Sequence, residues 1–191
     1  MIRAAIAVLV LLAFSPSLGS GFVWDDHLQV EHSKTVGHLA NIPGYFSQSV
    51  IEGLAEGEST ADGINLYRPL FSTMLTLTYW VAGGADARAF HAVSLLWHLL
   101  ACLLLFELGL RWLPHRWQSL LAVGFFAFHP VAASGVLFIS AVSEPIAAAL
   151  LFAALLVLDR GCAPDRTVQQ QRWAALVAGC TLLGALLGKE T

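Results

Sequence analysis

The stretch WQSLLAVGFFAFHPVAASGVLFISAVSEPIAAALLFAALLVL, residues 117–158, decides the fold, because its 42 residues carry one charge, that of Glu144. A helix that crosses a bilayer needs about 20 mostly apolar residues, since lipid offers no hydrogen-bond partner to a free backbone amide. The stretch is about twice that length. It therefore predicts two membrane-spanning helices joined in a hairpin by a tight turn near residues 140–145.

Three further uncharged runs lie outside this hairpin, at residues 4–24, 89–106 and 173–188. The composition of the whole chain agrees with a membrane protein, because 57% of its residues are hydrophobic and only 12% are charged. An ordinary soluble domain carries about 25% charged residues. We predict an all-α, polytopic transmembrane helical bundle of about five spans, at residues 4–24, 89–110, 117–139, 144–158 and 173–188.

The first run has a second interpretation. Arg3 followed by the apolar residues 4–14 also fits the charged and hydrophobic parts of a secretory signal, and residues 16–20, PSLGS, could surround a cleavage site. A signal normally introduces a soluble domain, whereas further spans follow here, so we expect an uncleaved anchor. In either case the residues that follow lie outside the cytoplasm.

The uncharged residues 69–85 are a candidate for a sixth span. With five spans, the arginines of the short segments all lie on the cytoplasmic side, as the positive-inside rule expects, whereas a sixth span would move Arg111 and Arg116 outside. Tyr79 and Trp80 also fit a helix at the membrane interface, where aromatic rings are enriched. We therefore expect residues 25–88 to form one long extracytoplasmic loop with interfacial helices. The arginines in question are Arg3, Arg111, Arg116, Arg160, Arg166 and Arg172.

Charge and cysteine content exclude other classes of protein. Ten Lys and Arg against 13 Asp and Glu give a net charge of −3, which argues against a nucleic-acid partner, since nucleic-acid-binding proteins carry a basic face. Cys102 and Cys180 lie in apolar runs, and Cys162 lies in a polar connector. These three cysteines predict neither a disulfide framework nor a paired-cysteine zinc site.

The five-span topology brings ionisable residues from distant parts of the chain to one membrane face. Ionisable groups at membrane depth are costly, so they suggest a functional site. The adjacent carboxylates of Asp25 and Asp26 follow the aromatic anchor Trp24, where partial desolvation would raise their basicity toward that of a general base. The residues that meet at this face are Asp25, Asp26, His27, Arg68, Glu144, Lys189 and Glu190.

Several of these residues also have a structural interpretation. Polar residues such as Asp25 and Asp26 are ordinary where a helix leaves the membrane, and an arginine such as Arg68 either grips a phosphate or snorkels to lipid headgroups. Glu144 before a proline is typical of a helix start. His129 before Pro130 more often marks a helix end or kink than a ligand.

Metal binding has little support in the sequence. His91 and His98 lie seven residues apart on one helix face, where we expect them to be packed or to face headgroups rather than to bind a metal. A divalent metal near Glu144 is conceivable, but no cluster has convincing ligand spacing. We therefore assign no metal ligands.

The order of several short motifs resembles the N-terminal part of the transmembrane and tetratricopeptide-repeat O-mannosyltransferases and their bacterial relatives. These enzymes belong to the GT-C glycosyltransferases, as does the protein O-mannosyltransferase family. The resemblance covers essentially the whole chain. The motifs are Phe22-Val23-Trp24-Asp25-Asp26, Leu66-Tyr67-Arg68-Pro69-Leu70, Phe90-His91, Phe128-His129-Pro130-Val131, Ser143-Glu144-Pro145 and Gly188-Lys189-Glu190.

The resemblance implies a membrane glycosyltransferase that takes a hexose, such as mannose, from a polyprenyl-phosphate donor. It would transfer the sugar with inversion to a hydroxyl of a protein or glycan acceptor on the extracytoplasmic face. The membrane would be the bacterial cytoplasmic membrane, or the endoplasmic reticulum in a eukaryote. Because these enzymes have more than five spans, the resemblance also implies that residues 1–191 are a fragment of a longer transmembrane domain.

The resemblance assigns roles to individual residues. Asp25 or Asp26 would hold the catalytic base, with a preference for Asp25, and Arg68 and Lys189 would bind the donor phosphate. The supporting residues of the site would be His27, His129, Glu144 and Glu190.

The sequence also departs from the family pattern. Ser134 and Val142 stand where the family commonly has an acid and an arginine, which leaves Glu144 without its usual basic neighbour and puts the sugar specificity in doubt. The alternative function is a non-catalytic membrane scaffold or part of a transporter, although transporters often show internal repeats and none is visible here.

Overall fold

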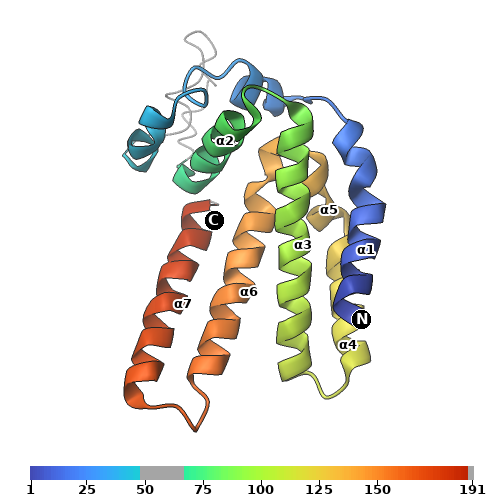
Figure 1. Ribbon diagram of the computed structural model, residues 1–191, viewed down its shortest axis with the longest axis vertical. Helices are drawn as coiled ribbons and strands as arrows, with labels where there is room; N and C mark the ends of the chain where they lie inside the picture. The colour runs from blue at the N-terminus through green and yellow to red at the C-terminus, as the bar shows by residue number, and fades with distance from the viewer. Residues whose placement is uncertain (48–66, 189–191) are drawn as a thin grey trace.

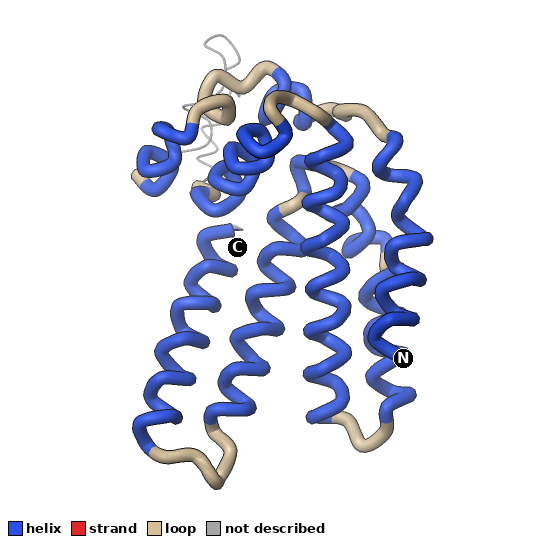
Figure 2. The backbone as a smooth tube through the Cα atoms, viewed as in Figure 1, coloured by secondary structure: helices blue, strands red, loops and turns tan. Residues whose placement is uncertain are grey.

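The computed structural model describes residues 1–47 and 67–188, and in these ranges it is helical and contains no strand (Figures 1 and 2). The predicted all-α class is therefore confirmed. The chain begins with α1 and a 3-10 helix, η1, and two short helices, η2 and η3, precede α2. The bounds are Ile2–Phe14 for α1, Ser15–Gly19 for η1, His27–Glu31 for η2, Leu39–Phe46 for η3 and Pro69–Ala82 for α2.

The remaining long helices run back and forth across the bundle, with α1 at one edge and α7 at the opposite edge (Figure 1). Four elements, Ile2–Gly19, α3, Ile139–Gly161 and α7, are long and apolar enough to cross a membrane, and α4 with α5 makes a fifth if the bent pair is one span. Four to five such helices indicate a multi-pass membrane protein. The bounds are Ala87–Trp112 for α3, Arg116–Phe128 for α4, Pro130–Leu137 for α5, Ile139–Ala141 for η5, Ser143–Gly161 for α6 and Val168–Gly188 for α7.

The bundle has two distinct ends. We call the end at the top of Figure 1, which carries η1, η2, α2 and η5, the loop end, and the opposite end, where α3 meets α4 and α6 meets α7, the connector end. At the connector end Arg3 pairs with Glu107, and Arg111 pairs with Asp159. These contacts tie α1 and α6 to α3. The predicted cytoplasmic arginines Arg3 and Arg111 therefore lie together at the end away from the candidate site.

The helix within the first predicted span, residues 4–24, ends before the predicted C-terminal boundary. Helical structure ends at Gly19 rather than at residue 24, and Ser20 is extended, with ψ 149°. Proline has no backbone N–H to continue an α-helix, and α1 gives way to the 3-10 helix at Ser15, next to Pro16. The hydroxyls of Ser15 and Ser17 donate to the carbonyls of Leu12 and Phe14 at 3.0 and 2.8 Å, which satisfies acceptors that the helix end leaves open.

The third predicted span, residues 117–139, is bent rather than straight. Helix α4 ends at Phe128, α5 begins at Pro130, and their axes differ by 54°. Because proline lacks an N–H and disfavours the helical region for the residue before it, His129 adopts an extended conformation, with ψ 133°. The interpretation of His129-Pro130 as a helix end is confirmed.

Helix α2 covers most of the disputed residues 69–85 and does not qualify as a span. Its 14 residues correspond to about 21 Å at 1.5 Å per residue, short of the roughly 30 Å hydrocarbon core. Gly83 ends it in the left-handed region, with φ 73°. Tyr45 of η3 bonds Thr76 of α2 through their hydroxyls at 2.8 Å. The placement of α2 at a membrane interface stays a prediction.

Candidate functional site

An apolar cluster at the loop end supports most of the candidate site. Its members come from the first loop, α2, α3, η5 and α6, so segments far apart in the sequence meet around one core. Asp26, Arg68 and Glu144 each lie within four residues of a cluster member along the chain. The buried members are Val30, Val36, Phe71, Leu75, Phe90, Ile139, Val142 and Ile146.

Asp26 is buried, with 0% of its surface exposed. Its Oδ2 accepts a hydrogen bond from the backbone N–H of Val23 at 3.2 Å, and its Oδ1 accepts one from the backbone N–H of Ser140 at 2.7 Å. The second bond joins residues 114 positions apart. Asp26 therefore connects the first loop to η5, the turn before α6.

Asp25 lies beside Asp26 in a different environment. Its side chain is exposed, and it makes no hydrogen bond or ion pair with any residue that the structure describes. The preceding residue, Trp24, has a φ of 51°, a region that large side chains rarely adopt. Of the two carboxylates, Asp25 is the accessible one.

His27 begins η2 and interacts locally. Its Nδ1 lies 2.6 Å from Oε2 of Glu31, one helical turn further on, and its ring stacks on that of His32 with centroids 6.3 Å apart. Both His27 and Glu31 are substantially exposed. Its ring also meets that of Phe22 edge-on, with centroids 6.3 Å apart, so the contacts of His27 are made with η2, with His32 and with the segment that precedes the carboxylate pair.

Arg68 caps the N-terminus of α2, and its carbonyl accepts from the N–H of Ser72 at 3.1 Å. Its Nε is buried and has no hydrogen-bond partner among the described residues. A buried donor without a partner costs about 1–3 kcal/mol. The guanidinium of Arg68 is therefore a donor suited to an anionic ligand.

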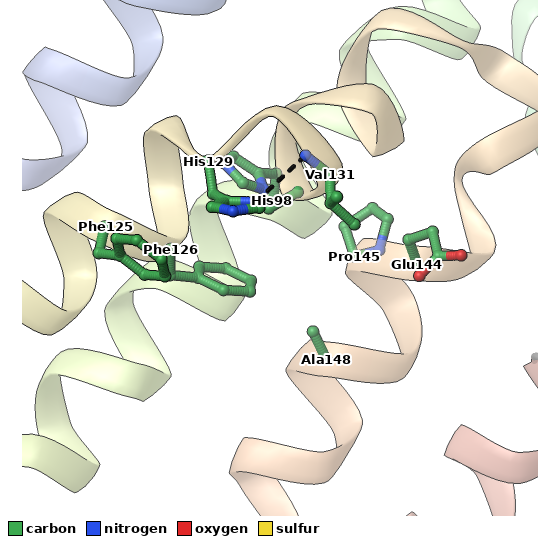
Figure 3. Close-up of a pocket in the computed structure, with 9 residues that line it drawn as sticks. His98, Phe125, Phe126, His129, Val131, Glu144, Pro145 and Ala148 are labelled. Carbon is green, nitrogen blue, oxygen red and sulfur yellow. Dashed lines mark hydrogen bonds between the residues drawn. The ribbon is translucent and has the colours of Figure 1, made fainter.

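Glu144 and His129 line one pocket of about 330 Å³ between the α4–α5 bend and α6 (Figure 3). Nδ1 of His129 accepts from the N–H of Val131 at 3.3 Å, so this side chain caps α5. Glu144 stands in the first turn of α6, as the helix-start interpretation predicts. Apart from these two residues and His98, the pocket lining is apolar; it consists of Phe125, Phe126, Val131, Ala132, Pro145 and Ala148.

His91 and His98 are both completely buried in the bundle. Nδ1 of His91 lies 3.3 Å from the carbonyl of Val136, and Nε2 of His98 lies 3.2 Å from the carbonyl of Ala127. The expectation that they are packed is confirmed, whereas the alternative that they face headgroups is wrong. The sequence feature that indicated these contacts is the presence of two histidines in one apolar run.

Lys189 and Glu190 lie outside the described residues. The last described residue, Gly188, shows where α7 ends: a Cβ there would meet Leu70 of α2 at 3.6 Å and Ile146 of α6 at 3.9 Å. The end of α7 is therefore close to the segments that carry Arg68 and Glu144. In the described ranges, no group of three or more His, Cys, Asp or Glu could hold a metal ion.

The structure thus brings several of the predicted residues to the loop end, but not into one contact network. Asp25 is exposed beside the buried Asp26, Arg68 lies at the start of α2, and Glu144 shares a pocket with His129. The residue that sequence reasoning missed is Ser140, which takes part through its backbone amide. Because nearly every residue has a backbone amide, the sequence does not single out the one that binds Asp26.

Two curated proteins match nearly the whole chain. One is protein O-mannosyl-transferase Tmtc2 of Drosophila melanogaster, 28% identical over 184 residues, which cover 96% of this chain and 19% of the relative. The other is protein O-mannosyl-transferase Tmtc1 of the same fly, 27% identical over 194 residues, which cover 98% of this chain and 21% of the relative. No family model matches the chain, and no solved structure matches it significantly.

The chain spans about one fifth of the length of these relatives. The similarity is distant, but it extends over the first loop, the bent helix pair and α6 together. The chain is therefore distantly similar to part of the protein O-mannosyl-transferases.

Proposed function

We propose that this chain forms part of a membrane glycosyltransferase of the GT-C type, which transfers a hexose from a polyprenyl-phosphate donor. The similarity of the chain to protein O-mannosyl-transferases favours mannose as this hexose. The acceptor is a hydroxyl of a protein or glycan on the extracytoplasmic face. The observation that carries the proposal is that the accessible carboxylate of Asp25 lies at the same bundle end as the Nε of Arg68, which has no hydrogen-bond partner among the described residues. The membrane is the cytoplasmic membrane of a bacterium or the endoplasmic reticulum of a eukaryote.

In this proposal Asp25 is the general base. The acceptor oxygen attacks the anomeric carbon of the sugar and passes its proton to Asp25, while the bond from that carbon to the phosphate oxygen breaks. The products are the glycosylated acceptor and the polyprenyl phosphate. A positioned base contributes about 10²- to 10⁴-fold to the rate. The exposure of Asp25 supports this role, because the acceptor can reach it.

Arg68 binds the donor phosphate, and Lys189 assists it. Negative charge grows on the departing phosphate, and a guanidinium already fixed in place stabilises this charge without reorganisation. A guanidinium can also fork onto phosphate oxygens. Because the leaving group carries a single phosphate, the reaction does not require a divalent metal, and the proposal includes none.

Glu144, His129, His27 and Glu190 support the site. The pocket shared by Glu144 and His129 lies directly after η5, to which the first loop is bonded. Its largely apolar lining, with the polar residues Glu144, His129 and His98, suits a ligand with an apolar body and a polar head. We assign these four residues to shaping the site rather than to bond breaking.

The test uses the full-length protein in membranes, with radiolabelled polyprenyl-phosphate mannose and an acceptor peptide. Asp25→Asn should reduce transfer at least about 100-fold, and Arg68→Gln should raise the donor KM. Matched controls are Asp165→Asn and Arg166→Gln, exposed side chains in the connector between α6 and α7, which should keep the unmodified rate. Unchanged transfer by Asp25→Asn would refute the proposed base. Absence of transfer by the unmodified protein with every hexose donor would favour the scaffold or transporter alternative.

A further inference from the structure

The turn at residues 23–26 is fastened on both sides of Asp25, to η5 through Asp26 and to Phe138 through Trp24. We infer that Asp26 is a positioning residue: it docks this turn onto η5 and thereby fixes the place of the Asp25 carboxylate. The inference rests on the proposed function, in which Asp25 is the base, and it gives the two adjacent acids different tasks.

The hydrogen bonds of Asp26 occupy both of its carboxylate oxygens. One accepts from Val23 inside the turn, and the other accepts from Ser140 in η5. The residue is also fully buried. A carboxylate that accepts backbone N–H bonds is stabilised in its charged form, and burial keeps an acceptor substrate away from it. Asp26 is therefore suited to holding the backbone rather than to receiving a proton from the substrate.

The turn itself is tight and strained. The N–H of Asp26 donates to the carbonyl of Val23 at 3.0 Å, so the turn is closed by this bond as well as by the side chain of Asp26. Trp24 sits in the left-handed region, with φ 51°. Such a conformation persists only where the surroundings impose it, and it is common at functional sites. Here the surroundings are the two bonds of Asp26.

A second contact fastens the same turn. The ring of Trp24, 83% exposed overall, lies with its centroid 6.5 Å from that of Phe138, at the end of α5. Asp25 is thus flanked by Trp24, which contacts Phe138, and by Asp26, which binds Ser140. If the bond to Ser140 were lost, Trp24 could relax and the turn would shift. A displacement of about 1 Å in a reacting group can cost about 10²-fold in rate.

The decisive variant is Asp26→Asn, in which one oxygen can still accept an N–H while the new NH₂ group faces the other donor. It should lower kcat by about 10- to 100-fold, leave the donor KM unchanged and keep the rising limb of the pH profile, because the proposed base, Asp25, is still present. Asp26→Ala should show the same pattern. Loss of the rising limb in Asp26→Asn, with activity that no longer depends on pH, would instead make Asp26 the base and overturn the inference.

Hydrogen exchange tests the docking without any activity. In the protein reconstituted in lipid nanodiscs, the amide of Ser140 should exchange at least 10-fold faster in Asp26→Asn than in the unmodified chain, while α3 and α6 keep their protection. The matched control is Asp86→Asn, another loop-end aspartate that accepts a backbone N–H, from Arg88 at 3.1 Å. It should leave Ser140 protected and kcat unchanged.

The two proposals fail in different ways. If Ser140 exchanges equally in Asp26→Asn and in the unmodified protein, the docking is refuted, whatever the transfer activity. If Asp25→Asn transfers sugar normally while Asp26→Asn accelerates exchange at Ser140, the proposed base is wrong and the docking is upheld. Unchanged kcat in Asp26→Asn together with faster exchange would refute the positioning role.

Discussion

Gly135 of α5 packs tightly against the first turn of α6, and it offers a sharp test of the packing beside Glu144. A Cβ added at Gly135 would stand 2.7 Å from Cδ of Pro145 and 3.3 Å from Cβ of Glu144. The proline ring cannot rotate away, so Gly135→Ala should force the two helices apart. Overpacking of this kind costs about 1–3 kcal/mol.

The control for this variant is Gly124→Ala in α4, where an added Cβ would meet nothing within 4 Å. Both changes gain the same helix propensity, about 1 kcal/mol, so the difference between them isolates the overpacking term. We expect Gly135→Ala to be less stable than Gly124→Ala by about 1–3 kcal/mol in reversible unfolding from mixed micelles. Equal stability of the two variants, within about 0.5 kcal/mol, would refute the close approach of α5 to α6.

Two other contacts give predictions of their own. His98→Ala removes a fully buried ring, which packs with Phe14 and Phe126 at centroid distances of 5.3 and 5.6 Å. The change should lower the free energy of unfolding by about 3 kcal/mol in the same assay, and His98→Phe should recover most of this loss. A loss below about 0.5 kcal/mol for His98→Ala would contradict the packing. Thr76→Val removes the 2.8 Å hydrogen bond to Tyr45. It should lower the free energy of unfolding by about 1 kcal/mol and make proteolysis of η3 faster. Unchanged proteolysis would show that this bond does not hold η3 on α2.

The approximate places of the membrane-length helices could be predicted from the sequence, because an uncharged run long enough to cross a bilayer usually forms a membrane-spanning helix. Their ends were less predictable. The C-terminal helix begins at Val168 rather than at residue 173, because Gln169–171 and Arg172 are compatible with a helix although they are too polar for a membrane core. The first helix is shorter than its uncharged run because that run contains Pro16.

The candidate site was harder to predict than the helices. Membrane topology alone was enough to place Asp25, Arg68 and Glu144 at one end of the bundle. It could not separate Asp25 from Asp26, because two adjacent acids look alike until burial and hydrogen bonds distinguish them. The partner of Asp26 is a backbone amide 114 residues away, and only the folded chain brings the two together.

The most direct test of the account is the sidedness of the loop end and the connector end. In a chain whose three cysteines are replaced by serine, single cysteines at Lys34, Arg116 and Asp165, all at exposed positions, would be treated with a membrane-impermeant maleimide. With the loop end outside, Lys34→Cys should react from the extracytoplasmic side of intact membranes, and Arg116→Cys and Asp165→Cys should react only after permeabilisation. Reaction of Lys34→Cys and Arg116→Cys from the same side would contradict this sidedness.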